Sequence, residues 1–358
     1  MLTDAFGIQR HYDDVDDVRR TILGQATVVS QLATTHAAKT AETLQTKLIE
    51  SHARFAEAAA AAAGSADLPA ALSEYAVDWA QRSVLFADIM RRRGDNYIDH
   101  EDAGSPPVLT FEYETIVDGR TLPDPVNYAL VEIVPSDGAR PDRTRRPYVV
   151  VDPRAGHGAG IGGSKSESQV GVALRGGHPV YFVIFFPHPE PGQTLADVCH
   201  AEAEFIRTVS ERHPDAPKPI VVGNCQGGWA IMLLSASNPD LTGPIVLNGS
   251  PLSYWAGENG KNPLRYLGGL MGGALPALIS SDIGHGKFDG ANLVLNFEAL
   301  NPGANWWRKY YTVFQKTDAE AERYLEFERW WGGFYFMNEA EIRWILDNLF
   351  IGNKLARG

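Results

Sequence analysis

A ten-residue stretch near the middle of the chain constrains the fold more than any other part of the sequence. Residues 219–228 read Pro-Ile-Val-Val-Gly-Asn-Cys-Gln-Gly-Gly, so a short β-branched run leads into a turn with glycines at positions 223 and 227. The residues that follow, 229–234, are apolar and helical in character. A strand, a tight turn and a helix in direct succession predict an α/β fold, in which helices cover a mostly parallel sheet.

The residue at the centre of this turn is Cys225, in the pattern Gly-x-Cys-x-Gly. The pattern matches the strained strand-to-helix turn, the nucleophile elbow, that usually carries serine. We therefore predict that Cys225 is a nucleophile, that the helix dipole favours its thiolate, and that the amide of Gln226 is one oxyanion donor. The alternative is a tight strand-to-helix turn around a buried, inert cysteine.

Composition excludes several classes of protein. The chain has 358 residues, 44% of them hydrophobic, and a formal net charge of −12, which argues against nucleic-acid binding. Two cysteines make no disulfide framework and predict a reducing compartment; Cys199 is expected to pack in a helix. Residues 1–7 do not resemble a signal peptide, and no apolar run of about 18 residues occurs. We expect a cytoplasmic protein with no membrane span, no metal and no cofactor.

Residues 1–104 are predicted to form a helical region. Apolar residues recur at helical spacing in the first part of it, and they are Val15, Val18, Ile22, Val29, Leu32, Leu44, Leu48 and Phe55. A second helix is expected over residues 68–93, ending at Gly94 after three arginines. The apolar stripe either packs on its own chain or forms an association surface for a second copy or another partner; the sequence leaves both alternatives open.

Residues 105–250 are predicted to form the sheet and its covering helices. The expected strands are 108–117, 126–134, 148–152, 179–186, 220–222 and 245–249, and the expected helices are 194–211 and 226–237. The first two strands suggest an antiparallel hairpin, while the later apolar runs are typical of buried parallel strands. Ligands of such sheets bind beyond the carboxyl ends of the strands, which is where Cys225 is expected.

A glycine-rich loop, residues 154–163, directly follows the strand at 148–152. A phosphate cradle is one interpretation, but the spacing of a Walker motif is absent. The better interpretation is an oxyanion loop, in which Gly158 supplies the second backbone donor. The neighbouring His157 either braces the loop or takes part in catalysis.

Residues 251–358 hold six of the eight tryptophans and no repeating β-α unit. We predict a cap or lid whose aromatic surface forms an apolar channel suited to an acyl chain. The alternative is an aromatic core in an irregular subdomain. An amphipathic helix is expected at residues 339–349.

The box Gly223-Asn224-Cys225-Gln226-Gly227-Gly228 resembles the cysteine "lipase box" of polyhydroxyalkanoate synthases. Residues 152–158 and 327–333 are more closely similar to a synthase-like family of uncharacterised function, the DUF3141 proteins. The resemblance implies an α/β-hydrolase-like fold and an acyltransferase that takes 3-hydroxyacyl groups from CoA thioesters onto a cysteine. Acyl-CoA would then be a substrate rather than a cofactor, and a polymer granule or a second copy would be the partner of the helical region. Only Cys225 and the amide of Gln226 have clear counterparts in the synthases.

The sequence departs from this pattern after the nucleophile. In this fold an acid and a histidine follow the nucleophile on loops after further strands, and these strands are not evident after residue 250. Asp282 and His285 have the right order, although residues three apart on one turn rarely reach the required geometry. The chain is therefore expected to be either an amino-terminal fragment or a protein without the full chemistry. A thiol hydrolase acting on thioesters or esters, and a non-catalytic protein that binds granules or a partner, are the alternative functions.

Overall fold

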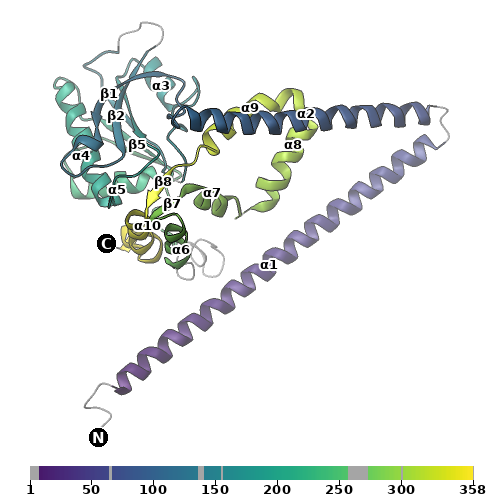
Figure 1. Ribbon diagram of the computed structural model, residues 1–358, viewed down its shortest axis with the longest axis horizontal. Helices are drawn as coiled ribbons and strands as arrows, with labels where there is room; N and C mark the ends of the chain where they lie inside the picture. Colours follow the sequence, from purple (N-terminus) through teal and green to yellow (C-terminus); the bar gives the residue numbers. More distant parts are fainter. Residues whose placement is uncertain are drawn as a thin grey trace. The chain divides into compact units, whose positions relative to one another are not determined.

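The computed structural model describes residues 8–63, 67–135, 141–154, 156–256, 273–299 and 301–357 (Figure 1). The chain divides into two compact units. One comprises Met1–Val84 and Tyr254–Gly273, and the other comprises Leu85–Ser253 and Ala274–Gly358. Each unit is described by itself below.

The first unit holds α1 (Ile8–Ala62) and the first half of α2 (Leu68–Asp102). The later part of the apolar stripe of α1 is exposed, with 58% of Leu44, 58% of Leu48 and 73% of Phe55 open to solvent. The earlier stripe residues have side chains outside the described part of the structure; they are Val15, Val18, Ile22, Val29 and Leu32. Within the described residues, no helix combines the length and the apolar character that crossing a lipid bilayer requires.

A six-stranded sheet forms the centre of the second unit, in the spatial order β1-β2-β4-β3-β5-β6. Its strands are β1 (Glu112–Asp118), β2 (Tyr128–Val134), β3 (Tyr148–Val151), β4 (Val180–Phe185), β5 (Ile220–Asn224) and β6 (Ile245–Asn248). The predicted antiparallel hairpin is confirmed, since β1 pairs antiparallel with β2. Strand β2 also runs antiparallel to β4, whereas β4, β3, β5 and β6 are parallel.

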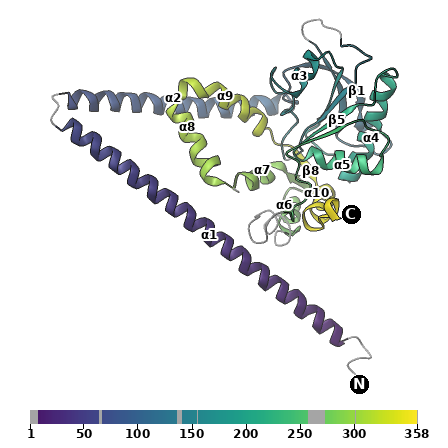
Figure 2. The ribbon, with the colours of Figure 1, turned by 180° about the vertical axis from the view of Figure 1, so that it is seen from behind.

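Helices cover both faces of this sheet. The helices α4 (Leu195–Arg212) and α5 (Gly227–Ser237) lie on one face, and α3 (Gln169–Arg175) lies on the other (Figures 1 and 2). Helix α4 begins where predicted because Thr194 and Asp197 form a reciprocal capping box. Its inner stripe is buried against the sheet, as the helical spacing of its apolar residues requires.

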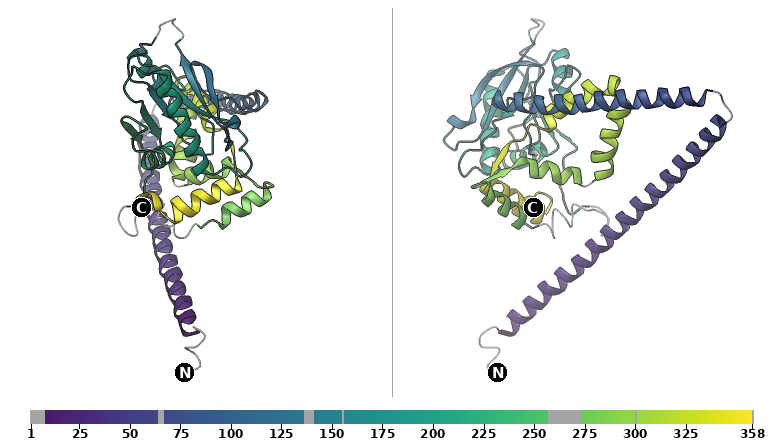
Figure 3. Two further views of the ribbon diagram at one scale, coloured as in Figure 1. Left: turned by 90° about the vertical axis from the view of Figure 1, so that its left-hand side faces the viewer. Right: turned by 45° about the vertical axis from the view of Figure 1, so that its right-hand side comes forward.

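The aromatic-rich region forms a cap, defined here as the elements after residue 274. Its helices are α6 (Leu275–Ile283), α7 (Gly290–Ala299), α8 (Lys309–Gln315), α9 (Thr317–Trp331), α10 (Glu339–Ile345) and α11 (Lys354–Arg357). Two π-helical turns, Gly303–Arg308 and Leu346–Ile351, precede α8 and follow α10. The short strands β7 (Lys287–Asp289) and β8 (Phe336–Asn338) pair antiparallel, and Figure 3 shows the cap from two further directions.

Backbone hydrogen bonds tie the cap to the loops at the carboxyl ends of the strands. The Tyr335 amide donates to the Gly156 carbonyl at 3.1 Å, and the Phe336 amide donates to the Pro187 carbonyl at 2.9 Å. The close approach depends on glycine, because a Cβ on Gly290 would lie 2.5 Å from the Cα of Gly156. The cap is therefore held against the sheet by main chain as well as by side chains.

The second half of α2 packs on the cap, and this contact corrects the predicted helix end. Helix α2 continues through Gly94 to Asp102. Ile89 is buried with residues of α8 and α9, and the Arg93 guanidinium binds the buried Glu328 carboxylate at 2.7 Å. Lys309 of α8 binds the other oxygen of that carboxylate at 2.9 Å. Beyond Gly94, the ring of Tyr97 packs on that of Phe334, with centroids 6.3 Å apart. Such tertiary contacts outweigh the local stop signal, since glycine inside a helix costs only about 1 kcal/mol.

Candidate active site

The structure places Cys225 in the strained conformation of a nucleophile elbow. Cys225 and Gln226 lie between the end of β5 and the start of α5, and Cys225 has a φ of +48°. A positive φ is uncommon for a residue other than glycine and marks a position that the surrounding structure enforces. The Cys225 amide is held by the carbonyl of Asn248 in β6 at 2.8 Å, which fixes the turn against the sheet.

Three glycines make room for this turn. A Cβ on Gly223 would lie 2.8 Å from the Cα of Gly228, and a Cβ on Gly227 would lie 2.5 Å from the carbonyl oxygen of Val151. A Cβ on Gly228 would lie 2.5 Å from the Cβ of Ser250 and closer still to its hydroxyl. Gly223 and Gly227 thus have the function that the sequence predicts, and Gly228 is required in addition.

The environment of the Cys225 thiol contradicts one prediction. Cys225 is half-buried, and burial raises the pKa of its thiol, while the amide of Gln226 acts in the opposite sense. The thiolate is therefore disfavoured by desolvation more than the Gln226 amide favours it. Cys199 is buried in α4 as predicted, with its Sγ 3.6 Å from the carbonyl of Ala230. Burial raises the pKa of the Cys199 thiol well above its usual value.

The two predicted oxyanion donors have different environments. The backbone N–H of Gln226 faces the Cys225 thiol, as an oxyanion donor at an elbow must. The backbone N–H of Gly158 instead donates to the carbonyl of Gly333 in the cap, at 3.0 Å. The prediction for Gly158 is therefore wrong in this structure, because that amide is already used to hold the cap.

His157 braces the loop and does not act as a base here. It is 1% exposed, its Nδ1 lies 3.1 Å from the Gly158 carbonyl, and its ring packs edge-on against Trp330 at 4.3 Å. Burial lowers the pKa of His157 to about 4. Of the two alternatives that the sequence left open, the structure supports the bracing role.

The predicted acid and base at Asp282 and His285 do not form a pair. Asp282 lies in the last turn of α6 and His285 lies in the turn before β7 with a φ of +54°, and both side chains are exposed. Only the backbone joins them, through the His285 amide and the Asp282 carbonyl at 3.1 Å. Among the described residues neither side chain has a hydrogen bond or ion pair, so a dyad with Cys225 is not formed.

The glycine-rich loop closes on a buried carboxylate that the sequence analysis missed. Asp152 follows β3 directly, and its Oδ2 accepts from the Gly160 amide at 2.7 Å. Its Oδ1 accepts from the Gly162 amide at 3.1 Å and from Nδ2 of Asn224 at 3.0 Å. Burial raises the pKa of Asp152, and these donors oppose the shift. The loop amides thus bind an internal carboxylate, which excludes the phosphate cradle at these positions.

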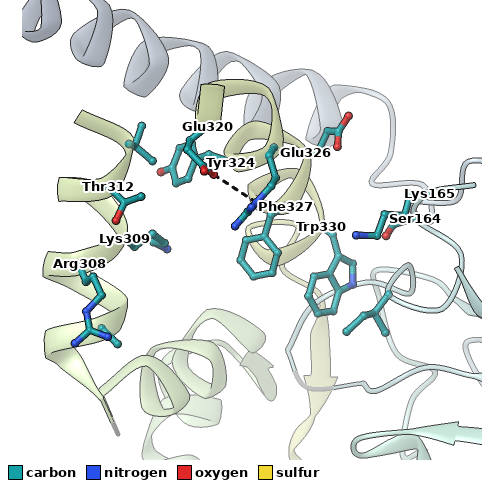
Figure 4. Close-up of a pocket in the computed structure, with 14 residues that line it drawn as sticks. Ser164, Lys165, Arg308, Lys309, Thr312, Glu320, Tyr324, Glu326, Phe327 and Trp330 are labelled. Carbon is teal, nitrogen blue, oxygen red and sulfur yellow. Dashed lines mark ion pairs between the residues drawn. The ribbon is translucent and has the colours of Figure 1, made fainter. Parts of the chain in front are cut away.

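A pocket of about 630 Å³ lies between α8, α9 and the glycine-rich loop (Figure 4). Tyr324, Phe327 and Trp330 of α9 give it an aromatic wall, and Lys165 and Arg308 lie at its rim. Within the described part of the chain, neither of these two cations has an ion pair. The pocket therefore combines an aromatic wall with two cationic side chains at its rim.

Cys225 does not line this pocket, but the glycine-rich loop joins the two features. Ile161 lines the pocket, and a Cβ on the next residue, Gly162, would lie 3.2 Å from Nδ2 of Asn224. Asn224 directly precedes Cys225. Among the residues that the structure describes, no group of three or more His, Cys, Asp or Glu side chains is arranged to hold a metal ion.

The sheet with its reversed second strand and the elbow after β5 define an α/β-hydrolase fold with cysteine in the nucleophile position. The chain belongs to the family described as "Protein of unknown function (DUF3141)", which matches residues 78–358. A Rhizobium meliloti protein described as "Uncharacterized protein in ackA 5'region" is 55% identical over 285 residues, which are 79% of this chain and 39% of the relative. This chain therefore spans about two-fifths of that relative's length.

Two solved structures illustrate the more distant similarities. The esterase RhEst1 from Rhodococcus sp. ECU1013 is 17% identical, with a TM-score of 0.32, over 61% of this chain and 72% of that one. The carboxylesterase CesB (YbfK) from Bacillus subtilis is 12% identical, with a TM-score of 0.29, over 54% of this chain and 58% of that one. Similarity at this level does not bear on the activity of this protein.

Proposed function

We propose that this protein is a cysteine-dependent acyltransferase of the polyhydroxyalkanoate-synthase type, which takes 3-hydroxyacyl groups from CoA thioesters. The observation that carries the proposal is the φ of +48° at Cys225, in a turn that three glycines make room for. Strain of this kind costs stability and is typical of positions that a reaction requires. An inert packing cysteine needs no such conformation, as Cys199 in the middle of α4 illustrates.

In the first half of the proposed reaction, Cys225 takes the acyl group from CoA. The Cys225 sulfur gives up its proton and attacks the thioester carbonyl, and the backbone N–H of Gln226 stabilises the negative oxygen of the tetrahedral intermediate. The carbon–sulfur bond to CoA then breaks, the CoA thiolate leaves and takes up a proton, and the acyl group stays on Cys225 as a thioester. In the second half, a hydroxyl group attacks this thioester and restores the thiol.

The cap decides between transfer and hydrolysis in this proposal. If the hydroxyl belongs to an alcohol the product is an ester, and if it belongs to water the protein is a thioesterase. The backbone links between the cap and the strand ends, including Gly158 with Gly333, favour transfer because they restrict the entry of water. The pocket beside α9 would take the acyl part, with its aromatic wall against the chain.

Intact-protein mass spectrometry tests this proposal. Incubation with 3-hydroxybutyryl-CoA should add one acyl group to the protein and release free CoA. Cys225→Ala should prevent both, whereas Cys199→Ser, which changes the buried packing cysteine, should prevent neither. If Cys225→Ala released CoA at the rate of the parent, the proposal would be wrong and the non-catalytic alternative would stand.

The exposed stripe of α1 supports a second proposal, which concerns partners. We propose that Leu44, Leu48 and Phe55, which share one helix face, associate with a second copy of the chain or with the surface of a polymer granule. Changing all three to serine should lower the mass in solution or release the protein from granules. A control with serine at Thr46 and Ala53, on the opposite face, should behave as the parent. Unchanged mass and granule binding in the triple variant would refute the proposal.

A further inference from the structure

A small cavity of about 20 Å³ lies behind the elbow, between β3, α4, α5 and α10. Glu202, Gln226 and Arg154 are among the residues that line it. These three side chains are 2%, 4% and 7% exposed. The cavity is therefore bounded by polar groups that are themselves buried.

The side chains around this cavity carry most of the unpaired buried polar atoms of the described structure. Five buried side-chain nitrogen or oxygen atoms have no hydrogen-bond partner there, and four of them belong to this cavity: both carboxyl oxygens of Glu202, Nε of Arg154 and Nε2 of Gln226. The fifth is the hydroxyl of Ser235, which does not line the cavity. Each such atom costs about 1–3 kcal/mol if it stays unpaired, so four around one space require an explanation.

The four atoms together complement one water molecule. When Glu202 is ionised, both of its carboxyl oxygens are acceptors, while Nε2 of Gln226 and Nε of Arg154 are N–H donors. A water molecule donates two hydrogen bonds and accepts two. A cavity needs about 10–15 Å³ to hold a water, so about 20 Å³ admits one and leaves no room for a larger ligand.

The charges around the cavity disfavour a cation. The two N–H donors would point at it, and the Arg154 guanidinium is already paired with the Glu341 carboxylate and donates to the Phe336 carbonyl at 2.7 Å. Tyr128 and Asp152 also line the cavity. Burial raises the pKa of the unpartnered Glu202 to about 8, and hydrogen bonds from a water would oppose that shift.

We propose that one water molecule occupies this cavity, and that it links Glu202 of α4 to the side chain of Gln226. Glu202 is then a positioning residue, because Gln226 directly follows the nucleophile and its backbone N–H faces the Cys225 thiol. The part of the inference that concerns catalysis rests on the proposed function, in which this N–H is the oxyanion donor. The presence of the water does not depend on the proposed function.

A crystal structure and the titration of Cys225 test the inference, and neither needs an acyl substrate. Density at high resolution should show one ordered water within hydrogen-bond distance of Glu202, Gln226 and Arg154. In Glu202→Gln, which keeps the size of the side chain, a third N–H donor would face a molecule with only two lone pairs, so the water should be lost or disordered. The Gln226 amide should then support the thiolate less well. A rise of about half a unit in the thiol pKa would slow alkylation of Cys225 about threefold at a fixed pH below that pKa.

Two controls separate positioning from loss of structure. Ser235→Ala removes the remaining unpaired buried hydroxyl, which is outside the cavity, and should leave the alkylation of Cys225 unchanged. Cys199 is buried on the same helix as Glu202, so its resistance to labelling reports that the core stays closed.

An empty cavity in the parent protein would overturn the proposed water. An ordered water with an unchanged alkylation profile in Glu202→Gln would overturn the positioning role. Failure of acyl transfer in the assay of the proposed function would leave both of these measurements intact.

Discussion

The reactivity of the Cys225 thiol is the property that the structure predicts most directly. Burial raises its pKa above 9.0, its ordinary value. A thiol with a pKa of 9.0 is about 1% thiolate at pH 7, and only the thiolate reacts with an alkylating reagent. The rate of alkylation by iodoacetamide should therefore rise about tenfold for each pH unit between 7 and 9, with no plateau in that range.

The measurement compares the folded with the unfolded chain in a Cys199→Ser background, so that one thiol remains. At pH 7 the folded protein should react more slowly than the same protein in denaturant, because unfolding removes the desolvation of the thiol. Mass spectrometry at timed intervals gives both rates. The sequence alone predicts the opposite order, since a helix amino terminus favours a thiolate.

A plateau below pH 8 would refute this reasoning, as would faster labelling of the folded protein at pH 7. Either result would mean that the amide of Gln226 and the helix outweigh burial. If the tenfold slope is observed, the resting thiol is not activated. Acyl transfer through Cys225 would then need a base that removes the proton as the substrate binds, and such help is typically worth about 10²–10⁴-fold in rate.

Three further predictions concern stability. Burial lowers the pKa of His157 from 6.5 to about 4, so the stability that its neutral ring contributes is complete above pH 6.5 and is lost as the pH falls towards 4. The loss amounts to about 3 kcal/mol. Unfolding of His157→Gln in denaturant should therefore depend less on pH in that interval than unfolding of the parent. Gly228→Ala should lower the free energy of unfolding by about 1–3 kcal/mol, because the new Cβ would overlap with Ser250. Ser250→Gly should restore that free energy in the double variant. If the effects of the two single substitutions simply added, the proposed overlap would be contradicted. Glu328→Gln should lower the free energy of unfolding by about 3 kcal/mol, because it leaves Arg93 and Lys309 facing a neutral group. Glu322→Gln, which changes an exposed ion pair, should alter that free energy little. Equal effects of the two variants in thermal unfolding would show that burial of the ion pair is unimportant.

The sheet and its elbow could be predicted because their signals are local. The run at Tyr148–Val151 is apolar throughout, as a strand buried on both faces must be, and the glycines around Cys225 mark a turn that few folds use. The end of α2 could not be predicted, because beyond Gly94 the helix packs through Tyr97 on Phe334, far along the chain. Local sequence carries no information about such partners.

The elbow that holds Cys225 could be predicted from the sequence, whereas the surroundings of Cys225 could not. The amide of Gly158 donates a hydrogen bond to the carbonyl of Gly333, and no local sequence pattern indicates that pairing. Glu202 did have a sequence signal, since it occupies the inner stripe of α4, one helical turn after Val198 and one before Ile206, where an apolar residue is expected. A charged residue at such a position is informative, because burying it without a partner is costly.

The left-handed backbone at Cys225 has a consequence for how this position can change over evolutionary time. A side chain in that conformation costs about 1–2 kcal/mol, which glycine largely avoids. If only folding mattered, random substitution would carry position 225 towards glycine or asparagine, since either relieves the turn without disturbing the sheet. Cys225→Gly should therefore be at least as stable as the parent. A thiol at that position means that selection acts there on something other than stability.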